Sequence, residues 1–151
     1  MKSDFMNSKE VKVFFEAVEE QYGVVPDVLR TFAYRTAKEK IYAITRDIDG
    51  VPLQGLRINS LGLYIAEFKD GQVRLSIEGA QLIGPHAKKN VCEVSDDEIK
   101  KWFQGHDLPM SGDYGGFVII KHGSDFVGSG KFKEGLIMNF VPKARRLIEV
   151  H

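Results

Sequence analysis

The first strong pattern along the chain is an amphipathic stretch near the N-terminus. From Val11 onward, apolar residues recur at the spacing of one helix face, which predicts a helix over Lys9 to Tyr22. Ser8 stands before this stretch as a candidate N-cap, and Gly23 follows it as a stop signal. One face of this helix is therefore expected to pack on a core.

Most of the remaining chain consists of short alternating segments that are typical of strands. β-Branched and aromatic residues alternate between residues 31 and 46, which predicts a hairpin. A second hairpin is predicted around Asp70-Gly71, because alternating apolar residues on both sides of Asp-Gly are a strong turn signal. Turns at Gly123 and Gly135 separate three more predicted strands, over residues 117–120, 126–131 and 136–140.

A further helix is predicted between these two groups of strands. Ser95 and Glu98 have the spacing of a capping box, and the apolar pattern continues through Trp102 to Gly105. The order of elements predicts an α+β fold with two parts. A small helix-plus-hairpin segment is expected over 1–50, and a small mixed or antiparallel β-barrel with short helices over 51–151.

Composition narrows the class of protein. With 151 residues, 43% of them hydrophobic and 28% charged, the chain suits one domain with an appendage. Cys92 is the only cysteine, which excludes an intramolecular disulfide and favours a reducing, cytoplasmic location. Neither a signal-peptide stretch before Asn7 nor an apolar run of about 20 residues occurs, so no membrane partner is expected.

Candidate catalytic groups are few. The four histidines do not fall at the i, i+2 or i, i+4 spacing that places two metal ligands on one element; they are His86, His106, His122 and His151. Cys92 lies in an apolar strand pattern, which favours a buried, inert thiol. Gly128 to Lys131 lacks the spacer of a phosphate-binding Walker loop. We expect no catalytic residue, no metal and no cofactor.

Charge and aromatic residues point instead to recognition in the last third of the chain. The formal net charge is zero, but three more basic than acidic residues lie between Lys121 and the C-terminus. Glycines and basic residues, which suit close contact with phosphate, are interleaved there with Phe132 and Phe140. These two rings can stack on bases or belong to the barrel core, and the sequence leaves both roles open.

The same region resembles a known family. Its segments follow, in order, the pattern of the PUA-like RNA-binding domain at the C-terminus of the Nol1/Nop2/Sun RNA cytosine-5 methyltransferases. The resemblance covers roughly Val91 to Arg146 and is weaker over Leu53 to Ala80. The matching segments are Trp102–Leu108, Gly116–Ile120, Phe126–Lys131, Gly135–Asn139 and Val141–Arg146.

This resemblance implies RNA binding by a PUA-like barrel, without the methyltransferase domain of that family. The family pattern carries over onto Gly128, Gly130, Lys131, Asn139, Pro142, Lys143 and Arg146. To these candidates the sequence itself adds Arg145, Lys133, Lys88 and Lys89, with Gly135 as a third glycine that shapes the backbone. Lysines and arginines are expected at phosphates, and Asn139 in a turn or at a base edge. Two positions depart from the family: Ser129 replaces an aromatic residue, and Met138 replaces a lysine.

Two main functions remain open at this point. The first is a non-catalytic protein that binds structured tRNA or rRNA, but not DNA, in RNA modification or ribosome assembly. The second is a protein–protein adaptor that acts with a separately encoded RNA-modifying enzyme. The adaptor predicts an exposed apolar patch on the N-terminal helix and hairpin. An enzyme with a pocket invisible in the sequence is a third alternative.

Overall fold

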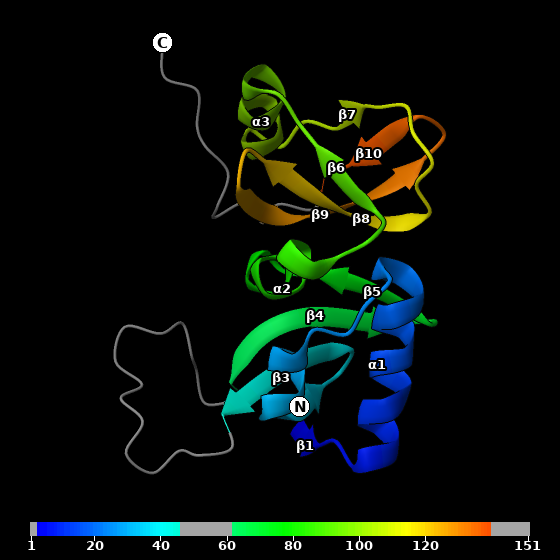
Figure 1. The fold of residues 1–151 in the computed structure, drawn as a ribbon, viewed down its shortest axis with the longest axis vertical. Helices are drawn as coiled ribbons and strands as arrows, with labels where there is room; N and C mark the ends of the chain where they lie inside the picture. The colour runs from blue at the N-terminus through cyan, green and yellow to red at the C-terminus, as the bar shows by residue number, and fades with distance from the viewer. Residues whose placement is uncertain (1–2, 46–61, 140–151) are drawn as a thin grey trace.

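Two five-stranded sheets follow one another along the long axis of the molecule, with helix α2 between them (Figure 1). The computed structural model describes residues 3–45 and 62–139. Within these ranges no helix is both long and apolar enough to cross a lipid bilayer.

The first sheet is antiparallel, and its strands pair in the order in which they occur along the chain. Asp70 and Gly71 both have positive φ, 53° and 75°, as a two-residue hairpin turn requires. This confirms the hairpin predicted from Asp-Gly, and the hairpin of residues 31–46 is confirmed as well. The strands are β1 (Ser3–Phe5), β2 (Phe32–Ala37), β3 (Lys40–Thr45), β4 (Leu63–Lys69) and β5 (Gln72–Leu75).

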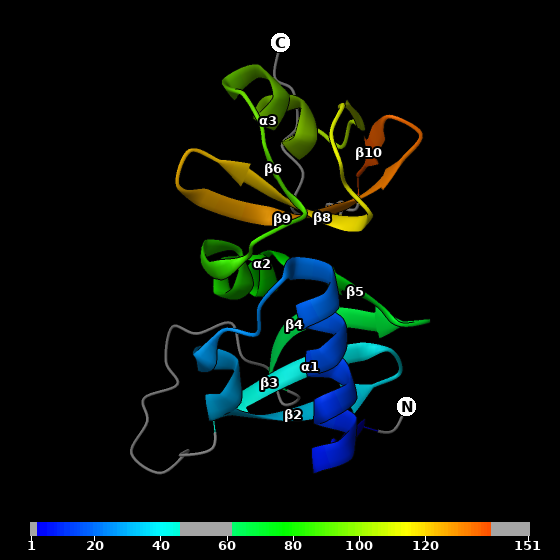
Figure 2. The ribbon, with the colours of Figure 1, turned by 45° about the vertical axis from the view of Figure 1, so that its right-hand side comes forward.

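Helix α1 (Ser8–Tyr22) crosses one face of this sheet (Figure 2). Its N-cap is Asn7 and not Ser8. The Asn7 side chain accepts from the Glu10 backbone N–H at 2.9 Å, and the Glu10 carboxylate accepts from the Asn7 backbone N–H at 3.0 Å. The prediction of Ser8 was therefore wrong by one residue, because a carboxamide oxygen caps a helix as well as a hydroxyl does. Gly23 ends the helix at φ 85°, as predicted.

Helix α2 (Ile77–Ile83) and the turn η2 (Gly84–His86) lie between the two sheets. Two glycines permit this close packing. A Cβ on Gly79 would collide with the Ile65 carbonyl of β4, and a Cβ on Gly84 would collide with the Phe126 ring. A shorter turn, η1 (Asp27–Thr31), leads from α1 into β2.

The second sheet is mixed and curls into a half-barrel. Its strand order is β6-β8-β9-β10-β7, and β6 pairs with β8 in parallel. Helix α3 (Asp96–Phe103), which starts with the predicted capping box of Ser95 and Glu98, packs Trp102 on one face. The strands are β6 (Val91–Glu93), β7 (Leu108–Pro109), β8 (Gly116–His122), β9 (Asp125–Lys133) and β10 (Leu136–Met138). The predicted α+β, PUA-like fold is confirmed.

Some expectations differ from these elements. The short strands β1 and β7 were not predicted, and β10 ends at Met138 instead of residue 140. The expected boundary between 1–50 and 51–151 lies in residues 46–61, outside the described ranges, and stays a prediction. Strand pairing nevertheless joins β4 and β5 to the N-terminal strands, so the first sheet extends to Leu75.

The side chain of Gln21, at the end of α1, links the two sheets. Its carboxamide nitrogen donates to the Val73 carbonyl of β5 at 3.0 Å and to the Phe117 carbonyl of β8 at 3.1 Å. Its oxygen accepts from the Val73 N–H at 3.1 Å. A single amide group therefore satisfies backbone atoms that lie in different sheets and far apart in sequence.

Replacing Gln21 with Ala should lower the free energy of unfolding by roughly 2–4 kcal/mol, because the hydrogen bonds of its carboxamide to Val73, Phe117 and the Tyr22 hydroxyl are lost at about 0.5–1.5 kcal/mol each. Urea denaturation of the purified variant measures this loss. The exposed neighbour Glu20, changed to Ala, is the control and should stay within about 0.5 kcal/mol of the wild type. Equal stability of the two variants would contradict the linking role of Gln21.

Replacing Trp102 with Ala should cost roughly 3–5 kcal/mol, because this side chain is fully buried between α3 and the second sheet. The exposed Lys101 changed to Ala is the matched control on the same helix. Thermal unfolding followed by circular dichroism compares them, and an unchanged midpoint in the Trp102 variant would refute its anchoring role.

Candidate nucleic-acid interface

The second sheet has one face that is only half covered. Alternate residues of its strands, such as Val118, Ile120 and Ile137, pack under Trp102. The opposite face carries Ile119, which belongs to the core beneath the first sheet. Farther along the same strands, at Lys133, Leu136 and Met138, the side chains of the described residues are exposed.

Strand register defines the residues on the uncovered half, which we call the open face. Lys131 pairs with Phe117 on one side and with Met138 on the other, and Lys133 pairs with Leu136. Leu136 and Met138 are among the most exposed large apolar side chains of the described residues, at 40% and 38%. The open face consists of Pro109, Phe117, Lys131, Lys133, Leu136 and Met138.

A groove lies where the open face meets the hairpin of β4 and β5. We call it the junction groove; it has a volume of about 190 Å³ and is lined by Glu67, Lys69, Asp70, Gln72, Arg74, Phe117 and Lys131. The ammonium group of Lys131 is 5.8 Å from the centroid of the Phe117 ring, within the range of a cation–π contact.

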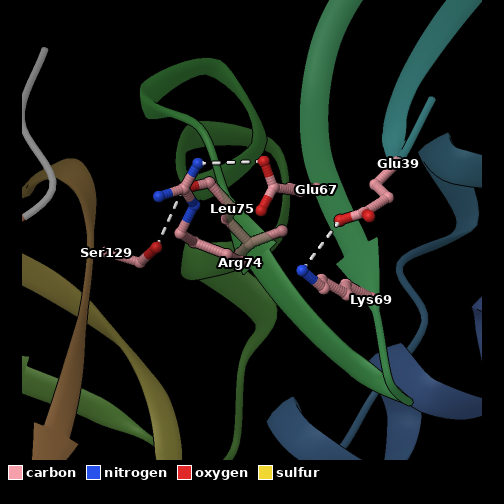
Figure 3. Close-up of polar contacts among 6 residues, drawn as sticks. All are labelled: Glu39, Glu67, Lys69, Arg74, Leu75 and Ser129. Carbon is pink, nitrogen blue, oxygen red and sulfur yellow. Dashed lines mark hydrogen bonds and ion pairs between the residues drawn. The ribbon is translucent and has the colours of Figure 1, made fainter. Parts of the chain in front are cut away.

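Ion pairs fix the charges along the first-sheet side of this groove (Figure 3). The Arg74 guanidinium contacts the Glu67 carboxylate at 3.2 Å, and both side chains are partly exposed. On the outer part of the hairpin, Lys69 pairs with Glu39 at 3.8 Å. The groove that contains the Phe117 ring is therefore lined by both positive and negative side chains.

Each of the three predicted glycines has a defined structural task. Gly128 lies at a β-bulge opposite Ile120, with φ 125°, as expected for a glycine within a strand. Gly130 allows Trp102 to approach β9, because a Cβ would lie 2.5 Å from the indole ring. Gly135 has φ 79° in the turn before β10.

Ser129, one of the two departures from the family pattern, is buried where the sheets meet. Its hydroxyl donates to the Leu75 carbonyl of β5 at 2.8 Å (Figure 3), and only 6% of the residue is exposed. A large aromatic side chain would not fit under β5. The serine thus lets the first sheet dock onto this face.

Asn139 has its amide group committed to the protein. Its Nδ2 donates to the carbonyls of Trp102 at 2.7 Å and His106 at 2.9 Å, and its backbone N–H donates to Asp107 at 2.7 Å. Both amide hydrogens are therefore used to close the end of α3. The structure supports the turn role considered for Asn139, and not a base-edge hydrogen bond from this NH₂ group.

The predicted basic residues do not all gather in one place. Lys131 and Lys133 lie on the open face, whereas Lys88 and Lys89 are exposed on the segment between η2 and β6. The other predicted residues of this surface lie outside the described ranges; they are Pro142, Lys143, Arg145 and Arg146, together with Phe140.

The aromatic residue on the open face is one that the sequence analysis missed. Phe132 is partly buried and packs edge-on against Tyr114 beside the second core, with ring centroids 5.4 Å apart, which supports the core role considered for it. Phe117 is partly exposed beside Lys131 instead. The alternation of side chains along a strand could have indicated this, because Lys131 and Phe132 are consecutive and must point to opposite faces of the sheet.

Three titratable groups outside the junction groove have defined partners or surroundings in the described residues: Cys92, Tyr114 and His122. Cys92 is buried, and burial raises the pKa of its thiol. The hydrogen bond with Cys92, together with partial burial, raises the pKa of Tyr114 to about 12. His122 pairs with Asp96 at 2.7 Å at the start of α3. Within the described ranges, no group of three or more His, Cys, Asp or Glu side chains is placed to hold a metal ion.

Comparison with known proteins identifies the domain that carries the open face. Residues 89–147 match the family described as the methyltransferase RsmF PUA domain. Ribosomal RNA small subunit methyltransferase F of Vibrio cholerae serotype O1 (strain M66-2) is 30% identical over 94 residues, which cover 61% of this chain and 20% of that protein. The protein of the same name from Vibrio vulnificus (strain YJ016) is 26% identical over 93 residues, with the same coverage.

The chain spans about a fifth of the length of these curated relatives. The matched family model covers the second sheet and α3, where the sequence analysis placed the resemblance. Residues 89–147 of this chain are therefore a PUA-like domain similar to that of the RsmF methyltransferases.

Proposed function

We propose that this chain is a non-catalytic RNA-binding protein that uses the open face to bind structured rRNA or tRNA in RNA modification or ribosome assembly. The observation that carries the proposal is that Lys131 and Lys133 project from the same face of β9, on the open face of a PUA-like domain. Ammonium groups on a partly apolar sheet suit a phosphate backbone whose sugars and bases also need contact surface.

The absence of catalysis is part of the proposal. The relatives are named as rRNA methyltransferases, but the chain matches only a fifth of their length, and the matched family model is that of their PUA domain. Cys92, the candidate nucleophile, is buried with a raised thiol pKa, which keeps it protonated and unreactive. The single cysteine also suits a reducing cytoplasm. A separately encoded RNA-modifying enzyme is the protein partner that this function would require.

Labelled rRNA fragments and bulk tRNA, titrated with the protein at about 50 and 200 mM salt, test the proposal by fluorescence polarisation. Affinity should fall steeply with salt, because each neutralised phosphate releases a counterion. Changing both Lys131 and Lys133 to Ala should reduce affinity about tenfold or more and lower the salt dependence. The exposed Lys100 of α3, on the other side of the same sheet, changed to Ala, is the control.

The tail residues Lys143 and Arg146, which lie outside the described ranges, belong to the same test. Because the proposal assigns both side chains to phosphate and not to the core, their double replacement by Ala should weaken RNA binding and leave the melting temperature nearly unchanged. Absence of binding to either RNA at low salt would refute the RNA-binding function.

A second candidate function, the protein–protein adaptor, is favoured by an apolar groove on the N-terminal part. This groove of about 470 Å³ lies between α1 and β2, and its lining includes Phe5, Phe15, Val25 and Phe32. Phe5 is 64% exposed, and together with the other rings of this lining it forms an exposed apolar surface of the kind that protein partners bind.

Replacing Phe5 with Asp should abolish capture of proteins that the wild-type chain retains, without changing RNA affinity. Parallel affinity purifications from the same lysate, quantified by mass spectrometry, make this comparison. Identical sets of retained proteins would exclude this groove as a docking site.

A further inference from the structure

We propose that the junction groove binds one unpaired nucleotide of RNA, with the base on the Phe117 ring and the phosphate between Lys131 and Arg74. This site rests on the proposed RNA-binding function and makes it more specific. The N-terminal sheet, which lies outside the matched family model, would then take part in recognition.

The aromatic platform is the first element of the argument. Phe117 is partly exposed at the start of β8, and its carbonyl accepts from Gln21, so the backbone that carries the ring is held in place. Lys131 now occupies space over this ring. An entering base replaces the ammonium group, and the flexible lysine then reaches the phosphate. Stacking of an unpaired base on an aromatic ring is tolerant of sequence.

The charges of the groove are the second element. Arg74 of β5 and Lys131 of β9 line the same groove as the Phe117 ring, so two cations reach it from different sheets. Glu67 is neutralised by Arg74 at 3.2 Å, which lowers its repulsion of a phosphate. Carboxylate and amide oxygens of Glu67, Asp70 and Gln72 can accept hydrogen bonds from the exocyclic amino groups of adenine, cytosine or guanine. Such a mixture suits a whole nucleotide better than a phosphate alone.

Size is the third element. The groove, at about 190 Å³, is smaller than the roughly 300–1,000 Å³ of sites for drug-sized ligands. One base fits this space, with its ribose and phosphate at the rim and the rest of the strand on the open face. A base within a duplex is stacked on both sides and cannot enter, so the site selects single-stranded RNA.

The test compares a labelled single-stranded RNA of about twelve nucleotides with the duplex that it forms with its complement. Replacing Phe117 with Leu should weaken binding of the single strand about tenfold and leave duplex binding and the salt dependence unchanged. Phe103, a partly exposed ring of α3 on the other side of the sheet, changed to Leu is the matched control and should bind both RNAs like the wild type.

Equal losses for the two RNAs, or no loss for either, would overturn the nucleotide site while leaving RNA binding itself intact. Failure of the wild-type chain to bind any RNA would instead refute the underlying function. Photocrosslinking of the unaltered protein to a 4-thiouridine-substituted strand gives an independent answer if the Phe117 variant folds poorly. Crosslinks are expected in residues 67–74 and 117–131, and crosslinks confined to other peptides would refute the site.

Discussion

The carboxamide of Gln21 is the interaction on which the arrangement of the molecule depends. It is held at the end of α1, where Gly23 ends the helix, and it reaches backbone atoms of β5 and β8 at once. Only a side chain with both a donor and an acceptor can satisfy the Val73 N–H together with two carbonyls. The hydroxyl of Ser129, bonded to the Leu75 carbonyl, closes the same junction from the opposite sheet. The junction groove exists because these contacts hold the two sheets in one orientation.

In this arrangement one part of a face of the PUA-like sheet packs on the first sheet, and another part of the same face is left exposed. Near Ile119 and Ser129 the face is sealed by the chain's own first sheet and α2. Near Phe117 and Lys131 it stays open to solvent. The exposed side chains of the open part alternate between apolar and basic, as a surface must if it is to meet bases and sugars as well as phosphates. Specificity for single strands would follow from geometry, because the groove edge admits a base but not a base pair.

Local signals in the sequence were sufficient for most elements. The Ser95 capping box, the Asp70-Gly71 turn and the stop at Gly23 each act within a few residues, and the structure confirms all three. Long-range pairing was harder to foresee. The register of β8 against β9 places Phe117 beside Lys131 on one face, and Phe132 lies on the other face against Tyr114. Composition alone could not tell these two rings apart. The sequence showed Ser129 only as a departure from the family pattern, because its partner Leu75 lies 54 residues earlier in the chain. Asn139 likewise bonds to Trp102 and His106, which no local pattern indicates.

The chain order of the two sheets also has a consequence for folding. Every described strand of the first sheet precedes every strand of the second, and four of the eight described strand pairings join neighbours through tight turns, which favours their rapid formation. The bond from Gln21 to Phe117, by contrast, spans 96 residues. During synthesis the N-terminal sheet can therefore assemble while the second is still incomplete. The junction groove would be the last feature to form, so a nascent chain acquires its two stable halves before it acquires the site that lies between them.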